Sequence, residues 1–96
     1  MKKESEKVER TETEDEKRVE EAMLVIVENQ LKENNPADTR VTLDRLMAMG
    51  ESRKNALQYI AIVLSDEVFE MMKDNVVFNE QRYIEKLKAL PELPEA

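Results

Sequence analysis

The sequence predicts a small all-α protein, and three observations support this prediction. Apolar residues between Val19 and Leu90 recur every three or four positions, which is the spacing of one face of an α-helix. Residues that favour helix starts, such as Ser52 and Asn79, precede these periodic segments. The only glycine, Gly50, follows the last periodic residue of one segment. Together they predict a bundle of three main helices plus a short C-terminal helix.

The first helix is expected to begin near Thr13, because Thr13 and Glu16 have the spacing of a capping box. It should end near Glu33. Val25 points away from the other apolar side chains of this helix. The others share one broad face, which comprises Val19, Met23, Leu24, Ile26, Val27 and Leu31.

The second helix is expected to start with Asn35 as its N-cap and Pro36 at its first helical position. Gly50 should follow its end, because a helix commonly closes with a residue in left-handed conformation and glycine adopts it at no steric cost. The predicted apolar face consists of Leu43, Leu46 and Met47.

The third helix should begin after Ser52 as N-cap and extend to about Asp74. Ile62 and Phe69, seven residues apart, lie opposite its main apolar face. A helix that is apolar on two sides is expected to be buried on two sides, so we place it at the centre with the other helices around it. The main face comprises Leu57, Ile60, Ala61, Leu64, Val68, Met71 and Met72.

The fourth helix is predicted to be short, with Asn79 as its N-cap and Pro91 as its stop. Phe78 can pack on Tyr83 as a hydrophobic staple. The inner face consists of Ile84, Leu87 and Leu90.

These elements predict a single helical domain over residues 13–90. Residues 1–12 are expected to form a disordered charged tail, because Val8 is their only clear apolar residue and cannot offset the entropy of ordering. Residues 91–96 should fray after Pro91.

Capping and apolar residues keep a distinctive spacing over a little more than half of the chain. They are Asn35-Pro36, Thr42, Arg45-Leu46, Gly50, Ser52, Ala56, Ile60-Ala61, Val63-Leu64, Glu67, Phe78, Arg82-Tyr83 and Leu87. In this spacing the stretch from Asn35 to Leu90 resembles an uncharacterised bacterial all-helical family, a domain of unknown function. The resemblance implies a compact helical module and brings no known activity, cofactor or catalytic residue.

The charge balance argues against nucleic acid and against an anionic membrane as partners. The net charge is −7, and the Lys and Arg residues are interleaved with acids, whereas phosphate binding needs clustered basic residues. The longest apolar run, Ala22 to Val27, is far shorter than the roughly 20 residues of a membrane span. The lack of cysteine fits the reducing cytoplasm.

The chain has no His and no Cys, which removes most nucleophile–base pairs and most transition-metal sites. We therefore expect no enzyme activity and no cofactor. The alternative is a carboxylate-based metal-binding protein or hydrolase that uses Asp66, Glu67 and Glu70, which are close on the third helix. The more ordinary interpretation of these three residues is a solvated acidic face.

Glu67 falls at the edge of the apolar face, where a carboxylate needs a partner. Arg45 and Arg82 are the plausible partners, and we predict a structural ion pair of Glu67, with Arg45 as the first choice. Val25, Ile62 and Phe69 are apolar residues outside the main faces. Spare apolar surface on a small domain indicates a contact, so we expect a protein-protein interaction or self-association module in which these three residues bind the partner.

Overall fold

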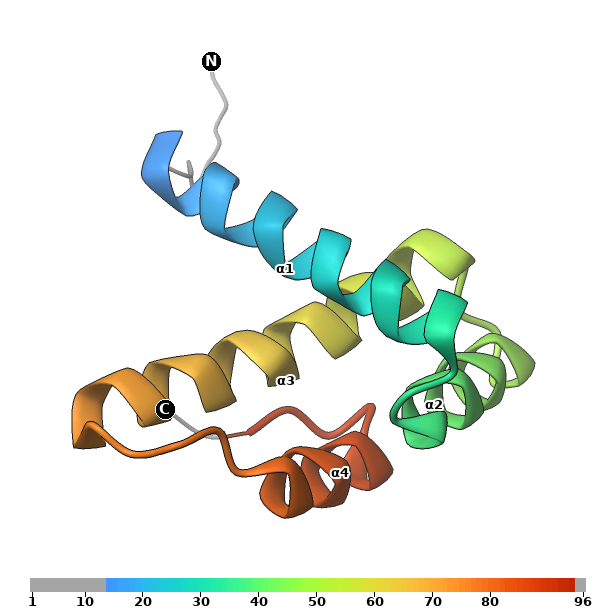
Figure 1. The fold of residues 1–96 in the computed structure, drawn as a ribbon. Coiled ribbons are helices and arrows are strands. Elements are labelled where there is room, and N and C mark those ends of the chain that lie inside the picture. Colours follow the sequence, from blue (N-terminus) through green and yellow to red (C-terminus); the bar gives the residue numbers. More distant parts are fainter. Residues whose placement is uncertain (1–13, 95–96) are drawn as a thin grey trace.

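The computed structural model describes residues 14–94, and over this range the chain folds into four α-helices (Figure 1). The predicted all-α class, with three longer helices and a short C-terminal one, is confirmed. The tail predicted for residues 1–12, the cap predicted at Thr13 and the last two residues lie outside the described range. The helices are α1 (Glu14–Glu33), α2 (Ala37–Ala48), α3 (Arg53–Asp74) and α4 (Glu80–Ala89).

The predicted N-caps of α3 and α4 are confirmed. The Ser52 hydroxyl accepts a hydrogen bond from the backbone N–H of Asn55 at 3.0 Å. The Asn79 side chain accepts one from the backbone N–H of Arg82 at 3.0 Å. Each cap satisfies a backbone donor that has no partner inside its helix, so these two short sequence signals were sufficient to locate the helix starts.

The predicted start of α2 is wrong by one residue. The helix begins at Ala37, and Pro36 is the N-cap, with extended backbone at φ −74° and ψ 151° and no side-chain cap. The Pro36 carbonyl accepts a hydrogen bond from the N–H of Thr39 at 3.1 Å. Pro36 therefore precedes the first helical residue, and Asn35 lies one position outside the helix.

Three helices end in residues with positive φ. Gly50 follows α2 at φ 109°, and the N–H of Glu51 donates to the carbonyl of Leu46 at 3.1 Å, which closes a Schellman motif and confirms the predicted role of the glycine. Asn34 after α1 and Asn75 after α3 take the same role at φ 52° and φ 56°. Asparagine tolerates this conformation better than most residues.

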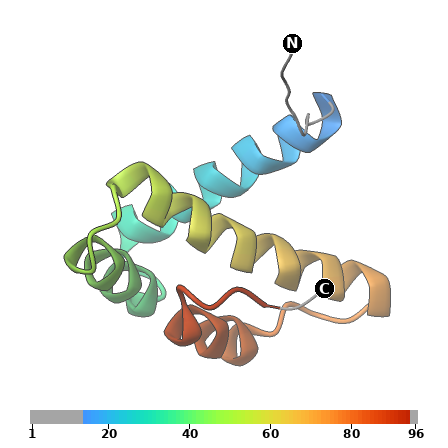
Figure 2. The ribbon, with the colours of Figure 1, turned by 180° about the vertical axis from the view of Figure 1, so that it is seen from behind.

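α3 packs against each of the other three helices, and so does α2 (Figure 1). The expectation that α3 is buried on two sides is wrong, because Ile62 and Phe69 on its second side are exposed. α1 runs antiparallel to α3, because Glu20 of α1 pairs with Gln58 while Glu28, further along α1, pairs with Arg53. Figures 1 and 2 show that the N-terminal end of α1 projects away from α3 and α4. Within residues 14–94, no helix combines the length and the apolar content needed to cross a bilayer.

The core contains apolar side chains from all four helices. The Phe78 and Tyr83 rings meet edge to face with their centroids 5.6 Å apart, which confirms the predicted staple. A polar contact at Gln30 joins three helices, since its Oε1 accepts from the Thr39 hydroxyl at 2.7 Å and from the Tyr83 hydroxyl at 2.8 Å. The buried apolar residues are Val27, Leu31, Leu43, Leu46, Ala56, Leu57, Ile60, Ala61, Val63, Leu64, Tyr83, Leu87 and Leu90.

The predicted apolar faces are only partly buried. Met47 of α2 and Met72 of α3 were expected inside but are exposed, and Thr39 and Thr42 of α2 are buried instead. Helical periodicity groups the residues of one face, but it does not show how far a neighbouring helix extends along that face. Met72 lies in the last turn of its helix, where the coverage ends.

Candidate functional site

The three residues predicted to bind a partner are uncovered within the described chain. Val25 of α1 is 59% exposed, and Ile62 and Phe69 of α3 are 46% and 61% exposed. Ile62 and Phe69 share the side of α3 that faces away from the buried Ile60. Both residues are exposed, so the surplus apolar surface expected from the sequence is present in the structure.

Ile62 and Phe69 have different surroundings. Ile62 borders a shallow open depression on α3, which is lined by Glu51, Asn55, Gln58 and Tyr59 as well as Ile62 itself. The Phe69 ring lies under the ammonium group of Lys73, whose Nζ is 5.9 Å from the ring centroid. Such a cation–π contact at an exposed position contributes about 0.5–1 kcal/mol and leaves most of the ring accessible.

α1 exposes more apolar surface than the sequence predicted. Val19 and Ile26 were assigned to its inner face, yet they are 50% and 39% exposed, and the neighbouring Ala22 is exposed as well. Only Val27 and Leu31 of this helix are buried. Val19 lies in the N-terminal half of α1, which projects beyond the helices that would cover it (Figure 2). Ile26 is exposed although the next residue, Val27, is buried, so Ile26 lies on the side of α1 that faces away from the other helices. The exposed surface therefore includes a larger part of α1 than Val25 alone.

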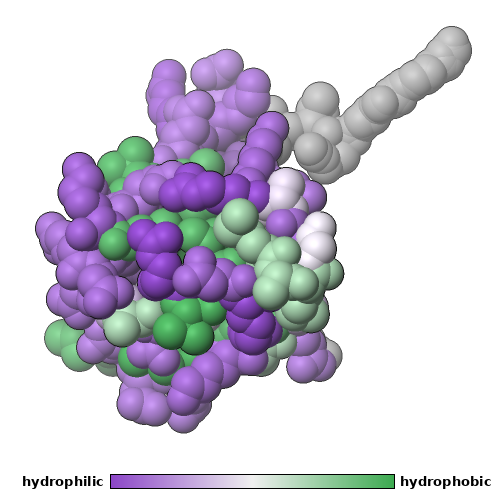
Figure 3. Space-filling view, turned by 90° about the vertical axis from the view of Figure 1, so that its right-hand side faces the viewer, coloured by the Kyte–Doolittle hydropathy of each residue, from purple (hydrophilic) through white to green (hydrophobic). Residues whose placement is uncertain are grey.

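Apolar side chains also reach the surface at the α2 end of the molecule. Figure 3 shows green apolar atoms there, interrupted by purple polar side chains. α2 and the turn after it expose Val41, Met47 and Met49. Scattered apolar residues are normal on a protein surface, so these residues do not by themselves mark a binding site.

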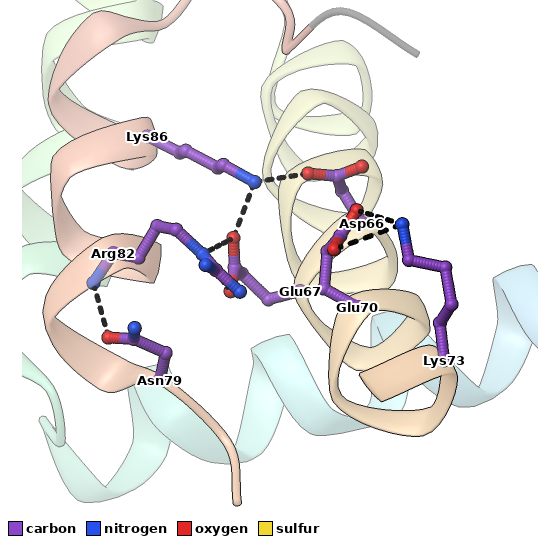
Figure 4. Close-up of polar contacts among 7 residues, drawn as sticks. All are labelled: Asp66, Glu67, Glu70, Lys73, Asn79, Arg82 and Lys86. Carbon is purple, nitrogen blue, oxygen red and sulfur yellow. Dashed lines mark hydrogen bonds and ion pairs between the residues drawn. The ribbon is translucent and has the colours of Figure 1, made fainter. Parts of the chain in front are cut away.

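Glu67 lies at the centre of a polar cluster between α3 and α4 (Figure 4). Its side chain is fully buried, and both of its carboxylate oxygens accept hydrogen bonds from the Arg82 Nε, at 2.9 and 3.0 Å. Lys86 approaches the same carboxylate at 2.5 Å and also pairs with Asp66. A carboxylate buried in this way needs such partners, and the cluster connects α3 to two successive turns of α4.

The predicted pairing of Glu67 with Arg45 is wrong, although Glu67 does form the structural ion pair that was expected. The partners are Arg82, which was the other candidate, and Lys86, which the sequence reasoning missed. Arg82 and Lys86 are four residues apart and share a face of α4, and this spacing was the available signal.

Arg45 instead binds the C-terminal end of α4. Its guanidinium donates to the carbonyls of Leu87 at 2.9 Å and Leu90 at 2.5 Å, with a longer contact to Lys88 at 3.4 Å. Leu87 and Lys88 lie in the last turn of α4 and Leu90 is its C-cap, and at this end the partial charge is negative and intrahelical donors are lacking. Arg45 therefore acts as a C-terminal cap supplied by another helix.

Each of the three carboxylates considered for metal chemistry is paired with a basic side chain of the chain itself. Asp66 and Glu67 share Lys86, whereas Glu70 pairs separately with Lys73 at 3.4 Å (Figure 4). Burial opposes the charge on Lys86, but the hydrogen bonds from its ammonium to Asp66 and Glu67 prevail and raise the pKa of Lys86. Among residues 14–94, no group of three or more acids is placed to hold a metal ion.

The fold and the exposed residues define a small all-α bundle that combines a buried ionic cluster with uncovered apolar positions on α1 and α3. No family model matches the chain, and comparisons with curated proteins and with solved structures give no match either. The resemblance of Asn35 to Leu90 to a bacterial helical family stays a prediction.

Proposed function

We propose that this chain is a non-enzymatic module for protein-protein interaction or self-association. The observation that carries the proposal is the exposure of large apolar side chains on α1 and α3, with Val25, Ile62 and Phe69 all at least 46% exposed. Burying such side chains in an interface gains about 25 cal/mol for each Å² of apolar surface removed from water. A protein partner can supply this burial.

The charge of the chain supports a protein rather than a polyanion as the partner. The net charge is −7, and the exposed apolar residues lie on helices that carry many acids. Nucleic acid and anionic lipid would both be repelled by this balance. The lack of cysteine suits an interaction in the reducing cytoplasm.

The carboxylate alternative gains no support from the geometry. Asp66 and Glu67 are engaged with Lys86 and Arg82, so a metal ion would have to displace two cations before it could bind both carboxylates. For this reason we do not put forward a metal-dependent function beside the interaction module.

A photo-crosslinking amino acid in place of Val25, Ile62 or Phe69 tests the proposal in the full-length chain. Extracts of the cells that produce the protein are irradiated, and the adducts are identified by mass spectrometry. We expect one defined adduct at all or some of these positions, either with a second copy of the chain or with one other protein. The matched controls carry the crosslinker at Gln81 and Lys88, which are exposed polar positions of α4.

A second measurement connects the adduct to the apolar surface. In a chain with the crosslinker at position 62, the substitution Val25→Asp should remove the adduct. It should not lower the melting temperature, because Val25 is largely exposed. The proposal would be overturned if the control positions gave the same adducts as positions 25, 62 and 69. It would also be overturned if no adduct formed and the chain sedimented as a monomer.

A further inference from the structure

α1 carries a second row of exposed side chains with a regular spacing. Its members are separated alternately by four and three residues, which is the spacing of the contact positions in a coiled coil. All of them are exposed, and Glu20 and Glu28, which contact α3, lie on roughly the opposite side of the helix. We call this set the outer row. It consists of Asp15, Val19, Ala22, Ile26, Asn29 and Glu33.

The middle of the outer row is apolar and its two ends are acidic. Val19, Ala22 and Ile26 form the apolar centre, and Val19 and Ile26 are 50% and 39% exposed. Ala22 is small, so a second helix can approach the backbone of α1 closely at this point. A row with coiled-coil spacing buries its residues best against another helix, whose side chains fit between them.

A second copy of α1 fits this row poorly because of its charges. In an antiparallel pair centred on the row, Asp15 of each copy meets Glu33 of the other, and Val19 meets Asn29. In a parallel pair, each acid meets itself. Both orientations oppose like charges at the two ends of the contact, and like charges across an interface are unfavourable. The whole chain adds to the repulsion with its net charge of −7.

Within residues 14–94, the ion pair of Asp15 does not neutralise its end of the row. Arg18 lies 3.9 Å from Asp15, but both side chains are largely exposed, at 73% and 93%. An exposed pair of this kind contributes little and leaves the carboxylate available to another cation. Charge complementarity therefore favours a partner with basic groups at the two ends of the contact.

We propose that the outer row of α1 docks a helix of another protein that has apolar contact residues in its middle and Lys or Arg opposite Asp15 and Glu33. This proposal rests on the proposed function and specifies the partner chemistry for one surface of the module. The apolar centre supplies most of the binding free energy, and the acidic ends select the partner, because complementary charges mainly give specificity.

Two synthetic helical peptides test the docking proposal. Both carry leucine and isoleucine at the contact positions opposite Val19, Ala22 and Ile26; one has Lys at the two end positions and the other has Glu. The full-length chain should bind the Lys peptide about tenfold or more tightly than the Glu peptide, as measured by fluorescence anisotropy. Raising the salt from about 0.1 M to about 1 M, which shortens the Debye length from about 10 Å to about 3 Å, should remove most of this preference.

Variants of the chain make the test specific for the outer row. The double variant Asp15→Lys/Glu33→Lys should reverse the preference between the peptides. Ala22→Gln should weaken both complexes, because it adds bulk at the point of closest approach without adding charge. Val41→Gln on α2, which is 62% exposed, is the control and should leave the affinity for both peptides unchanged. Circular dichroism melting of each variant checks that the fold is retained.

Equal binding of the two peptides, or no binding of either, would overturn the docking proposal. So would self-association of the chain in sedimentation that Ala22→Gln abolishes, because a second copy would then occupy the row. If the peptides fail while specific crosslinks at positions 25, 62 and 69 persist, the interaction module stands and only this partner chemistry falls.

Discussion

Glu67 shows how one buried residue can fasten two helices. It is 1% exposed, and its carboxylate accepts two hydrogen bonds from Arg82 and pairs with Lys86. Its partners remain partly exposed, so they keep some of their hydration while the carboxylate loses nearly all of its own. In such an arrangement the ion pairs of Glu67 offset the cost of taking its carboxylate out of water. Removing the charge of Glu67 therefore destabilises the protein by more than the net contribution of the pairs.

The first prediction compares two carboxylates of the same helix. Glu67→Gln should lower the free energy of unfolding by about 1.5–3 kcal/mol, because hydrogen bonds to a charged group are lost in a buried place. Glu70→Gln is the matched control. Glu70 pairs with Lys73 at 3.4 Å on a more accessible surface, and its loss should cost less than about 1 kcal/mol. Urea unfolding of both variants measures the difference, and equal midpoints would contradict the structural role of Glu67.

At the scale of the elements, the residues that follow α2 and α3 differ in how unfavourable their backbone conformation is for a residue with a side chain. Gly50 has φ 109°, and a Cβ added there would meet no atom within 4 Å. Asn75 has φ 56°, in the left-handed helical region. A substitution at either position therefore changes the local backbone energy and the closing turn of the helix, with little effect on packing.

The second prediction follows from this difference. Gly50→Ala should lower the free energy of unfolding by about 1–2 kcal/mol, because a residue with a Cβ is strained at that φ. Asn75→Gly should leave stability unchanged or raise it slightly, since glycine adopts the left-handed conformation without strain. Thermal melting of both variants tests the pair. A Gly50→Ala protein as stable as the wild type would show that the turn after α2 can take another conformation.

The helix ends are also where sequence reasoning was most successful. Ser52, Asn79 and Gly50 act through backbone atoms a few residues away, so their roles can be read from local spacing. Asn35 was misplaced by one residue because an asparagine before a proline fits a cap as well as the position outside it. Phe78 and Tyr83 were found for the same reason as the caps, since the staple is a local contact.

The contacts between distant segments could not be predicted in the same way. Arg45 and Arg82 are both basic and both precede apolar residues, and local spacing in the sequence does not show which of the two reaches Glu67. The exposure of Val19 and Ile26 depends on which side of α1 packs on the other helices and on how far α1 extends past them, and both are properties of the packed molecule. The outer row is visible as a spacing in the sequence, but periodicity alone could not show that this face is uncovered.

For the whole molecule, the polar contacts inside the bundle join all four helices. Gln30 of α1 accepts hydrogen bonds from Thr39 of α2 and from Tyr83 of α4, and Glu67 connects α3 to α4. Because these contacts share α4, a change in one protonation state should weaken the packing of the whole bundle. The global unfolding free energy is therefore the quantity that responds to pH.

The last prediction concerns alkaline pH. Burial raises the pKa of Tyr83 above its ordinary value of about 10, although the hydrogen bonds of its hydroxyl with Thr39 and Gln30 act in the opposite direction. The raised pKa of Lys86 acts in the same sense. For both groups the protonated form is favoured in the folded chain. Their contribution to stability is complete below the unfolded pKa and is lost as the pH rises through the folded pKa.

The unfolding free energy should therefore fall as the pH rises above about 10, by up to about 1.4 kcal/mol per pH unit for each proton involved. Tyr83→Phe should be less stable near neutral pH by about 0.5–1.5 kcal/mol, because it loses the hydrogen bond to Gln30. The decline of this variant with pH should nevertheless be shallower, since only the Lys86 part remains. Urea midpoints measured across this range decide the matter, and parallel declines for wild type and Tyr83→Phe would show that the Tyr83 hydroxyl does not couple to unfolding.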